Sequence, residues 1–484
     1  MGKKIIIIGA GLAGLSSGIH LQQKGYSTEI FELASSAGGQ CTAWTRKGYR
    51  FDGCIHWMVG TKSDNEIYKL YRNVDALVED TTIYNSPSLL IELNGIMYNV
   101  PLEITKFRSF LHKLAPEDKD SIDKFCNDIK IMVDTKMVMG PPETLAGMLS
   151  FLKNSTGFIK LASKYSKKSI SDILFVFKNE NLKKIIISIM PANFSALALF
   201  MMLGNRMGNN AGYPIGGASD LIKRMEEKYY TLGGKITYNS KVDKIIVENG
   251  IATSIETNDK LYEASGIVAA CDAYDTLYNM LDNKYKHPQL NKMLHNAELF
   301  NPLILVSFGL DKKFNIPYST AYEYQSGIEV APNKFTYGFN LRAFDFDFTA
   351  APENCSSAMV LLEAPLDYWV NLRAENYTDY EKQKEIIANT IKNIIDERIP
   401  GFSNSIKVVD VATPATYIRY TNIYKGSWEG FLPTPKALMT KIKRTIPKVK
   451  NLFVCGQWTT PGGGICTAVN DGKVIAKMIS KSIK

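Results

Sequence analysis

A run of four isoleucines that ends in a glycine-rich turn is the feature that most limits the folds open to this chain. Residues 4–8 read KIIII, and Gly9, Gly11 and Gly14 follow in the order GxGxxG. A strand that is apolar at every position is typical of a parallel sheet covered on both faces. The sequence therefore predicts a βαβ unit, with a strand at 4–8, a helix at 12–24 and a strand at 26–32.

The three glycines and a later acid have the spacing of a dinucleotide-binding site. Gly9 permits the tight turn, Gly11 lets a pyrophosphate approach the backbone, and Gly14 packs the helix against the strand. The helix N-terminus supplies amide donors to the phosphates. Glu32 closes the second strand, where its carboxylate can accept hydrogen bonds from the ribose hydroxyls. A glycine-rich turn without a ligand is the alternative, which the strand, helix and acid together disfavour.

The residues after Glu32 resemble the amine-oxidase/phytoene-desaturase superfamily of flavoproteins. Gly38 and Gly39 match its E-x5-GG pattern, and GYRFD at 48–52 matches the G-[FY]-x-FD motif that follows. The resemblance implies FAD as the cofactor, with Gly38, Gly39 and Gln40 beside its phosphates. Gln40 stands where the family usually has Arg or Lys, so one cation is missing there.

The C-terminal stretch NLFVCGQWTTPGGGICTAVNDG resembles the strand and PGGG turn of the same superfamily. The resemblance implies that the isoalloxazine end of FAD lies over the N-terminus of the last helix. Helix amides there would stabilise negative charge on the reduced ring. The further cofactor contacts that it implies are Val242, through its backbone at the adenine, and Gly456, Gly463, Gly464 and Val469.

YPIGGASDL at 213–221 matches a further motif of the superfamily, and TPATYIRYTN at 413–422 followed by GSWEGF resembles the branch of phytoene desaturases, carotenoid isomerases and retinol saturases. This branch implies hydride transfer at carbon–carbon bonds of a hydrophobic unsaturated substrate, such as a carotenoid, isoprenoid or lipid. Desaturation, saturation and isomerisation all stay open. A flavin amine or amino-acid oxidase is the first alternative. A non-catalytic prenyl-lipid carrier of the same fold is the second.

The motifs lie in three separated stretches of the chain, so we expect two interleaved domains. The fold class is α/β, with a Rossmann-like FAD-binding domain interleaved with a mixed α+β substrate-binding domain. The expected FAD-binding domain comprises residues 1–95, 205–299 and 411–484. The expected substrate-binding domain comprises residues 96–204 and 300–410.

The first insertion is basic and apolar. Residues 151–184 carry eight lysines against two acids, and residues 185–204 are almost wholly apolar but contain Pro191. A pair of buried core helices is the favoured interpretation. The alternatives are a substrate tunnel or a peripheral membrane contact through residues 150–204. We expect the part that faces a hydrophobic substrate within residues 140–204.

The candidates for chemistry follow the FD motif: Cys54, His56 and Trp57. His56 is the natural proton donor or acceptor near neutral pH, although a structural histidine is an equal alternative. Cys54 is either a reactive thiol or a small buried residue, and Trp57 is expected in the pocket wall. His20, on the first helix, is expected at the surface.

Charge and cysteine content exclude several classes of protein. Lysine and arginine exceed the acids by 57 to 48, a net charge of +9 spread along the chain, which disfavours nucleic-acid binding. Seven cysteines without a CxxC pair disfavour a disulfide framework and a zinc site, and favour a reducing cytoplasm. Asp345 and Asp347 alternate with phenylalanines as in a strand, so no metal is predicted. The sequence leaves the oligomeric state open.

Overall fold

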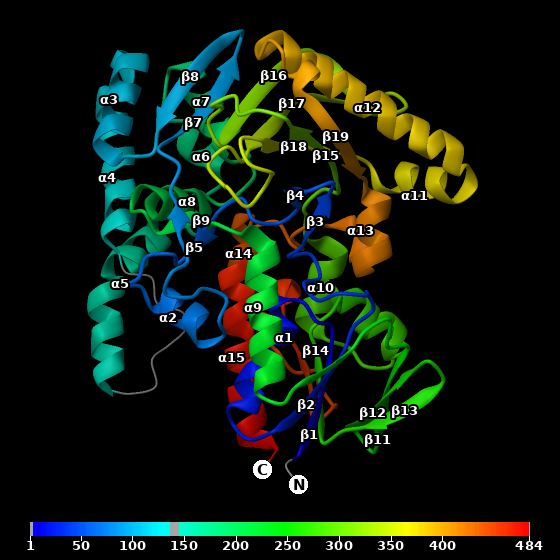
Figure 1. The fold of residues 1–484 in the computed structure, drawn as a ribbon. Coiled ribbons are helices and arrows are strands. Elements are labelled where there is room, and N and C mark those ends of the chain that lie inside the picture. The colour runs from blue at the N-terminus through cyan, green and yellow to red at the C-terminus, as the bar shows by residue number, and fades with distance from the viewer. Residues whose placement is uncertain (1–2, 136–144, 484) are drawn as a thin grey trace.

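A computed structural model describes residues 3–135 and 145–483, with side chains from 155 onward in the second range (Figure 1). The part of the expected substrate-facing segment at residues 140–144 lies outside the described residues. A parallel sheet, a larger mixed sheet and a group of helices make up the molecule. The predicted α/β class with a Rossmann-like core is confirmed.

The parallel sheet contains the predicted βαβ unit. Its strand order is β10-β2-β1-β14-β20. In that order the bounds are Lys235–Thr237, Ser27–Phe31, Lys4–Ile8, Gly266–Ala269 and Leu452–Val454. Ile5 and Ile7 pack against one layer of the core and Ile6 and Ile8 against the other, so both faces of β1 are buried, as the isoleucine run predicts.

Three helices cover one face of this sheet: α1 (Leu12–Gln22), α9 (Gly217–Thr231) and α15 (Ile465–Ser482). The antiparallel strands β11 (Lys244–Glu248), β12 (Ile251–Thr257) and β13 (Lys260–Glu263) and helix α10 (Pro288–Asn296) cover the other. His20 on α1 is buried, with its ring nitrogen 2.8 Å from the Ser16 carbonyl oxygen. The expected surface position is therefore wrong, because α15 and the C-terminal residues pack over that face of α1.

The mixed sheet has seven strands in the order β19-β15-β18-β17-β16-β7-β8. In that order the bounds are Ile406–Ala412, Leu303–Leu310, Ser356–Glu363, Lys334–Ala343, Ser319–Ala331, Ser88–Leu93 and Ile96–Pro101. Helices α11 (Leu366–Glu375) and α12 (Tyr377–Arg398) pack on it.

Two strands of this sheet differ from the expected domain limits. β7 lies before the expected boundary at 95 yet pairs in parallel with β16, and β19 continues past 411. Both strands thus pair with strands of the expected substrate-binding segments, and the division into two domains stays a prediction. Asp345 and Asp347 follow the end of β17 in a turn, not in the expected strand.

A group of helices forms the third part, on the left of Figure 1. Its members are α3 (Ile104–Leu114), α4 (Lys119–Asp134), α5 (Leu145–Tyr165), α6 (Ile170–Leu174), α7 (Glu180–Ile189) and α8 (Ala196–Met207). The chain breaks at Pro191 between α7 and α8, and both helices bury apolar residues in one core. The favoured interpretation, a core helix pair, is confirmed. No helix in the described part of the chain is long and apolar enough to cross a bilayer.

Short elements connect these parts. They are β3 (Ala43–Arg46), β4 (Tyr49–Asp52), β5 (Met58–Val59), β6 (Ile83–Tyr84), β9 (Ala211–Pro214), α2 (Glu66–Asn73), α13 (Pro414–Thr421) and α14 (Pro435–Leu438). β3 and β4 form a hairpin, and β9 pairs with both β5 and β6.

Candidate functional site

One cavity of about 550 Å³ joins the parallel sheet to the helical part. Gly11 at the first turn and Gly464 at the start of α15 both line it, although 453 positions separate them. Its volume lies within the usual range for small-molecule sites. Val242 of the middle stretch lines the cavity as well, so the three distant stretches of the chain meet at one site.

The GxGxxG turn is shaped for two different purposes. A Cβ on Gly14 would lie 1.9 Å from the Gly9 carbonyl oxygen, so Gly14 is required for the helix to pack on the strand. A Cβ on Gly11 would meet only the Gly38 carbonyl oxygen, at 3.8 Å. Packing of the chain does not explain the glycine at Gly11. The backbone there faces the cavity, where a pyrophosphate would need the space.

Glu32 lies at the edge of the same cavity. Its two carboxylate oxygens accept hydrogen bonds from the amides of Ala10 at 2.6 Å and Ala34 at 2.8 Å. Burial raises the pKa of Glu32, while these amides lower it. The amides fix the carboxylate beside the turn, where a ribose would lie. Val242 lines the cavity nearby.

Gly38, Gly39 and Gln40 also line the cavity, as the resemblance implies. The Gln40 side-chain nitrogen donates to the Ser427 carbonyl oxygen at 3.0 Å. Its oxygen is buried and has no hydrogen-bond partner among the described residues. The same holds for two more polar atoms of cavity-lining side chains, Gln457 Nε2 and Trp458 Nε1. Buried polar atoms without partners are costly, so this lining fits a bound polar group.

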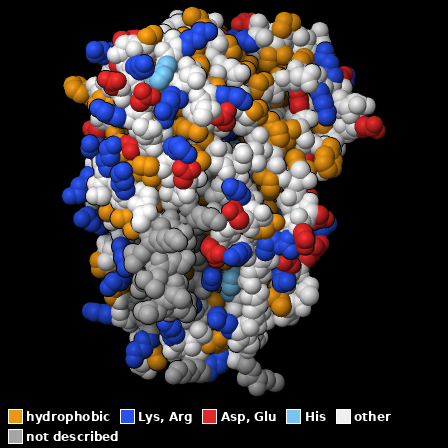
Figure 2. Space-filling model, turned by 90° about the vertical axis from the view of Figure 1, so that its left-hand side faces the viewer, with side chains coloured by type: hydrophobic (Ala, Val, Ile, Leu, Met, Phe, Trp, Pro, Cys, Tyr) orange, Lys and Arg blue, Asp and Glu red, His pale blue; other side chains and the backbone are white. Residues whose placement is uncertain are grey.

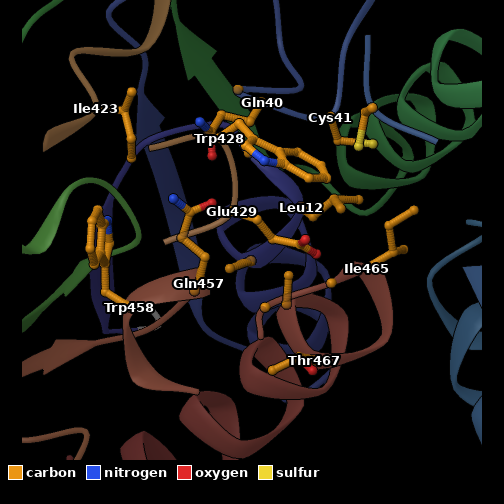
Figure 3. Close-up of a pocket in the computed structure, with 18 of the residues that line it drawn as sticks. Leu12, Gln40, Cys41, Ile423, Trp428, Glu429, Gln457, Trp458, Ile465 and Thr467 are labelled. Carbon is orange, nitrogen blue, oxygen red and sulfur yellow. The ribbon is translucent and has the colours of Figure 1, made fainter. Parts of the chain in front are cut away.

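The first turn of α15 forms the floor of the cavity (Figure 3). Gly463 has a φ of 46° and Gly464 a φ of 93°, in the left-handed region that favours glycine. Both glycines, and Gly456 after β20, line the cavity. The amides at this helix N-terminus provide a positive end for an electron-rich ring. Gly9, Gly11, Glu32 and this turn together fit FAD.

Val469 does not lie in the lining. It is fully buried between α15 and α1, where its carbonyl oxygen accepts a hydrogen bond of 2.7 Å from the Ser16 hydroxyl. Its position one turn into α15 turns it away from the cavity, so the expected cofactor contact is replaced by a helix-packing role. Gly14 likewise acts in packing and is not in the lining.

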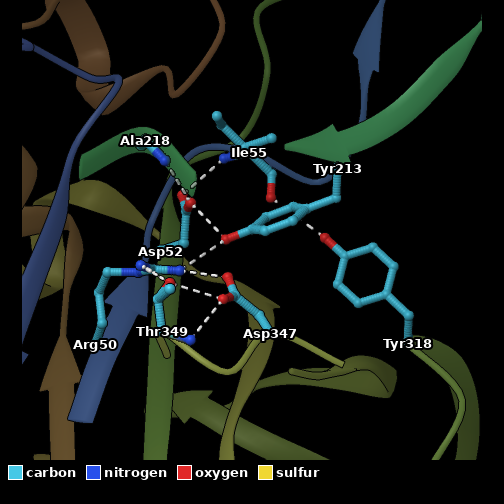
Figure 4. A network of polar contacts seen from close by, with 8 residues as sticks. All are labelled: Arg50, Asp52, Ile55, Tyr213, Ala218, Tyr318, Asp347 and Thr349. Carbon is cyan, nitrogen blue, oxygen red and sulfur yellow. Dashed lines mark hydrogen bonds and ion pairs between the residues drawn. The ribbon is translucent and has the colours of Figure 1, made fainter. Parts of the chain in front are cut away.

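A buried polar network fixes the loop that follows the FD motif (Figure 4). Asp52 accepts hydrogen bonds from the amides of Cys54 at 3.0 Å and Ile55 at 2.9 Å, and from the Tyr213 hydroxyl at 3.0 Å. Arg50 pairs with Asp347 at 2.5 Å, with both side chains buried. Asp52 therefore holds the loop in place from outside the cavity.

The three candidates on that loop, Cys54, His56 and Trp57, all line the cavity. Burial, followed by the charge of Arg342, lowers the pKa of His56 well below its usual range. A hydrogen bond to Cys41, followed by burial, raises the pKa of the Cys54 thiol. Both side chains are therefore neutral near pH 7. His56 lies against Trp428, with ring centroids 5.6 Å apart.

Glu429 is a lining residue that sequence reasoning missed. Its side chain projects into the space above the first turn of α15 (Figure 3), and a Cβ on Gly463 would lie 2.8 Å from its Cγ. Burial raises its pKa to about 8. The signal was present in GSWEGF, where Glu429 stands at the aromatic position of the G-x-x-[YF]-G pattern that the segment resembles.

The part of the lining next to the helical group is mostly apolar. It comes from the α7–α8 break, the adjoining face of α8 and Phe300 before β15. Its members are Met190, Phe194, Ala198, Met201, Met202 and Phe300, with Asn205 of α8 as a polar member. No group of three or more His, Cys, Asp or Glu side chains in the described ranges is placed to hold a metal ion.

Comparison with known proteins matches the chain to the family model described as flavin containing amine oxidoreductase, over residues 12–479. The chain is 25% identical to the 1-hydroxycarotenoid 3,4-desaturase of Flavobacterium sp. (strain P99-3), covering 99% of both chains. It is 24% identical to the chloroplastic prolycopene isomerase of Daucus carota, covering 99% of this chain and 80% of that protein.

Among solved structures, a double mutant of putrescine oxidase has the same fold. Its TM-score is 0.65 at 15% identity, covering 99% of both chains. At this identity the likeness concerns the fold alone.

Proposed function

The chain belongs to the family of flavin-containing amine oxidoreductases and is an FAD-dependent oxidoreductase, and from this premise we propose that it acts by hydride transfer on carbon–carbon bonds of a hydrophobic unsaturated substrate. Two relatives, named as a 1-hydroxycarotenoid 3,4-desaturase and a prolycopene isomerase and each matched over 99% of this chain, support this substrate class. The observation that carries the proposal is the shared lining of one cavity, by Gly11 and Gly464 at one end and by Met190, Phe194 and Met202 at the other.

When bound, FAD supplies the capacity to accept or donate a hydride. Glu32 would hold its ribose and the backbone at Gly11 its pyrophosphate. The amides at the start of α15 would orient the ring end. The apolar side chains of the α7–α8 segment would bind the substrate hydrocarbon and exclude water from the reacting carbon atoms.

In this proposal the proton is moved by the Glu429 carboxyl group and not by His56. A catalytic acid or base works best when its pKa is near the operating pH. Burial brings the pKa of Glu429 to about 8, whereas the pKa of His56 is held far below neutrality. His56, Cys54 and Trp57 then serve as walls that position the substrate. The Glu429 carboxyl donates a proton for saturation and, ionised, accepts one for desaturation.

The experiment is product analysis with purified, flavin-loaded protein. Candidate polyenes are incubated anaerobically with the oxidised and the reduced enzyme. We expect loss or gain of a double bond, or a changed double-bond geometry, and these outcomes sort the three reactions. Oxidation of simple amines with rapid reoxidation by air, and no change in any polyene, would instead favour the amine-oxidase alternative. A protein that neither carries nor takes up FAD would contradict the proposal.

We also propose a peripheral membrane contact through the loop between α6 and α7. Phe175 there is 90% exposed and Val176 60% exposed. Lys167, Lys168 and Lys178 lie close by in the sequence and are exposed. Exposed apolar side chains beside cations are typical of an interfacial site on anionic lipid.

A further inference from the structure

A second cavity, of about 450 Å³, lies where α1, α2 and α15 meet. Its volume is within the usual range for small-molecule sites. Each of the three helices contributes lysines to the lining, namely Lys24 at the end of α1, Lys69 on α2, and Lys473 and Lys477 on α15. None of its lining residues also lines the first cavity. We call this second site the lysine cavity.

The lysine cavity is strongly positive. Its lining contains the four lysines and one acid, Glu66, which gives a net charge of +3 with His20 neutral. Glu66 pairs with Lys69 at 2.6 Å, whereas Lys24 and Lys473 form no ion pair in the described part of the chain. Lys473 lies in the middle of α15, so the negative end of that helix does not account for its position. A concave wall of one charge sign attracts ions of the opposite sign.

His20 places a buried ring nitrogen at the wall of the lysine cavity. The residue is only 7% exposed, and its Nδ1 lies 2.8 Å from the Ser16 carbonyl oxygen, which makes Nδ1 the donor. Burial, and to a smaller extent the charges of Lys473 and Lys24, lowers the pKa of His20 to about 4, so the ring is neutral. Nε2 has no hydrogen bond to a described residue. It is therefore left as an acceptor for a ligand that carries a proton.

The rest of the lining limits the size and kind of ligand. Leu70 is its one apolar side chain, and no Phe, Tyr or Trp ring from the described residues belongs to it. The lining thus offers no ring on which a nucleobase would stack and little surface for a hydrocarbon chain. A compact anion fits the lysine cavity better than a nucleotide or a lipid tail.

We propose that the lysine cavity binds a compact oxyanion of the phosphate class, as inorganic phosphate or as a diphosphate group. Lys24 and Lys473 would neutralise its charge through charge-assisted hydrogen bonds. His20 Nε2 would accept a hydrogen bond from the protonated oxygen that phosphates keep at neutral pH and that sulfate lacks. The site is separate from the turn that would hold the FAD pyrophosphate, because it lies further along α1 and α15, beyond the ends that adjoin Gly11 and Gly464. It does not depend on the proposed function.

The test is calorimetric titration of the FAD-loaded protein, in which the flavin site is filled, with pyrophosphate and with sulfate at equal ionic strength. We expect the wild type to bind pyrophosphate at least about tenfold more tightly than sulfate, because sulfate would leave Nε2 facing an oxygen without a proton. Lys24→Gln/Lys473→Gln should weaken pyrophosphate binding by about tenfold. Lys260→Gln/Lys334→Gln makes the same change of charge at two exposed positions outside the lining, and should leave binding unchanged.

His20→Leu tests the selectivity separately from the charge. It keeps the position apolar and should reduce the preference for pyrophosphate over sulfate while leaving sulfate binding as it is in the wild type. Because His20 is buried, thermal unfolding is measured for each variant. Should His20→Leu not fold, the two lysine variants still decide the site, since both alter exposed side chains.

Vesicles distinguish a lipid headgroup from a free anion as the source of the phosphate. Sedimentation with phosphatidylcholine vesicles that contain phosphatidate, reduced by Lys24→Gln/Lys473→Gln and not by the control pair, would assign the site to a headgroup. Pyrophosphate binding without this effect would assign it to a soluble anion. Equal affinity of the wild type for pyrophosphate and sulfate, or equal weakening of pyrophosphate binding by both lysine pairs, would overturn the inference.

Discussion

At the residue scale, Gly11 and Gly14 look alike in the sequence but differ in the structure. Alanine at Gly14 would clash with the Gly9 carbonyl oxygen at 1.9 Å, whereas alanine at Gly11 would meet nothing nearer than 3.8 Å. We expect Gly11→Ala to fold with the stability of the wild type and to bind FAD at least about tenfold more weakly, because its methyl group would occupy the space of the pyrophosphate. Flavin content after gel filtration and thermal unfolding of the flavin-free protein measure the two effects.

Gly14→Ala is the matched control for this prediction. We expect it to lower stability even without FAD, since the clash is within the chain itself. Normal FAD retention by Gly11→Ala would contradict the assignment of the turn to the pyrophosphate.

Glu429 gives a pH-dependent prediction. Its pKa rises from the ordinary 4.5 to about 8 in the folded protein. Between these two pH values the folded state therefore keeps a proton that the unfolded state has lost. The stabilisation that this proton gives to the folded state is lost as the pH rises through that range. Relative to Glu429→Gln, the wild type should lose at most about 1.4 kcal/mol of unfolding free energy per pH unit. Chemical denaturation of flavin-free protein from pH 5 to pH 9 measures the difference.

The exposed Glu263 provides the comparison, because Glu263→Gln should differ from the wild type by a constant amount across this range. A constant difference for Glu429→Gln as well would mean that Glu429 is ionised at neutral pH and would remove the reason for assigning it the proton.

The positions of single residues could be predicted where the sequence pattern that indicates them is local. The spacing of Gly9, Gly11 and Glu32 is enough to place them at one turn, and all three line the cavity. His20 and Val469 were misplaced because α1 and α15, which pack together, are more than 440 positions apart in the chain. Whether a helical residue faces solvent, cavity or neighbouring helix depends on such a partner, which periodicity alone does not identify.

At the element scale, the contact between α1 and α15 places the PGGG turn before α15 next to the GxGxxG turn before α1. It depends on small residues: a Cβ on Gly472 would lie 2.4 Å from the Ser16 hydroxyl oxygen and 2.5 Å from the Ser17 amide nitrogen. We expect Gly472→Ala to destabilise the protein by about 1–3 kcal/mol, despite the better helix propensity of alanine, because the helices must separate. Urea denaturation measures this.

The neighbouring Lys473 is exposed, so Lys473→Ala should change stability little and serves as the control on the same helix. Unchanged or increased stability of Gly472→Ala would show that the two helices can adjust without cost.

Elements of the first stretch were predicted nearly to the residue: β1 spans Lys4–Ile8 as expected, and α1 ends at Gln22, two residues early. The seven-stranded sheet was not predicted. Its strands come from residues 88–101, 303–363 and 406–412, and the parallel pairing of β7 with β16 joins segments more than 200 positions apart. Strand register of this kind is fixed by tertiary packing and not by local pattern.

At the scale of the whole molecule, the α7–α8 segment connects the surface to the cavity. The lysine-rich sequence raised three interpretations, of which the core helix pair is confirmed. The break between the two helices also lines the cavity, and the substrate tunnel stays a prediction. Composition can indicate an apolar segment, but it does not indicate that one face of α8 would point into the cavity. That arrangement follows from the packing of α8 on α4.

The third interpretation, a membrane contact, gives the last prediction. Figure 2 shows basic side chains intermixed with apolar ones on the side that carries α3, α4 and α5. We expect the protein to sediment with vesicles that contain anionic lipid at 0.1 M salt and to be released at 1 M salt, because screening weakens the attraction of the lysines. Phe175→Ser/Val176→Ser should reduce binding at low salt, since it removes the apolar part of the contact.

Phe348→Ser is the matched control, because Phe348 is 74% exposed but follows β17 of the seven-stranded sheet. Equal loss of binding in both variants, or binding that ignores lipid charge, would contradict a contact at the α6–α7 loop. The placement matters for the chemistry: α7 starts five residues after Phe175, and Met190 and Phe194 just beyond its end line the cavity. A loop held at the lipid surface would thus keep the apolar end of the cavity close to the phase in which a hydrophobic substrate dissolves.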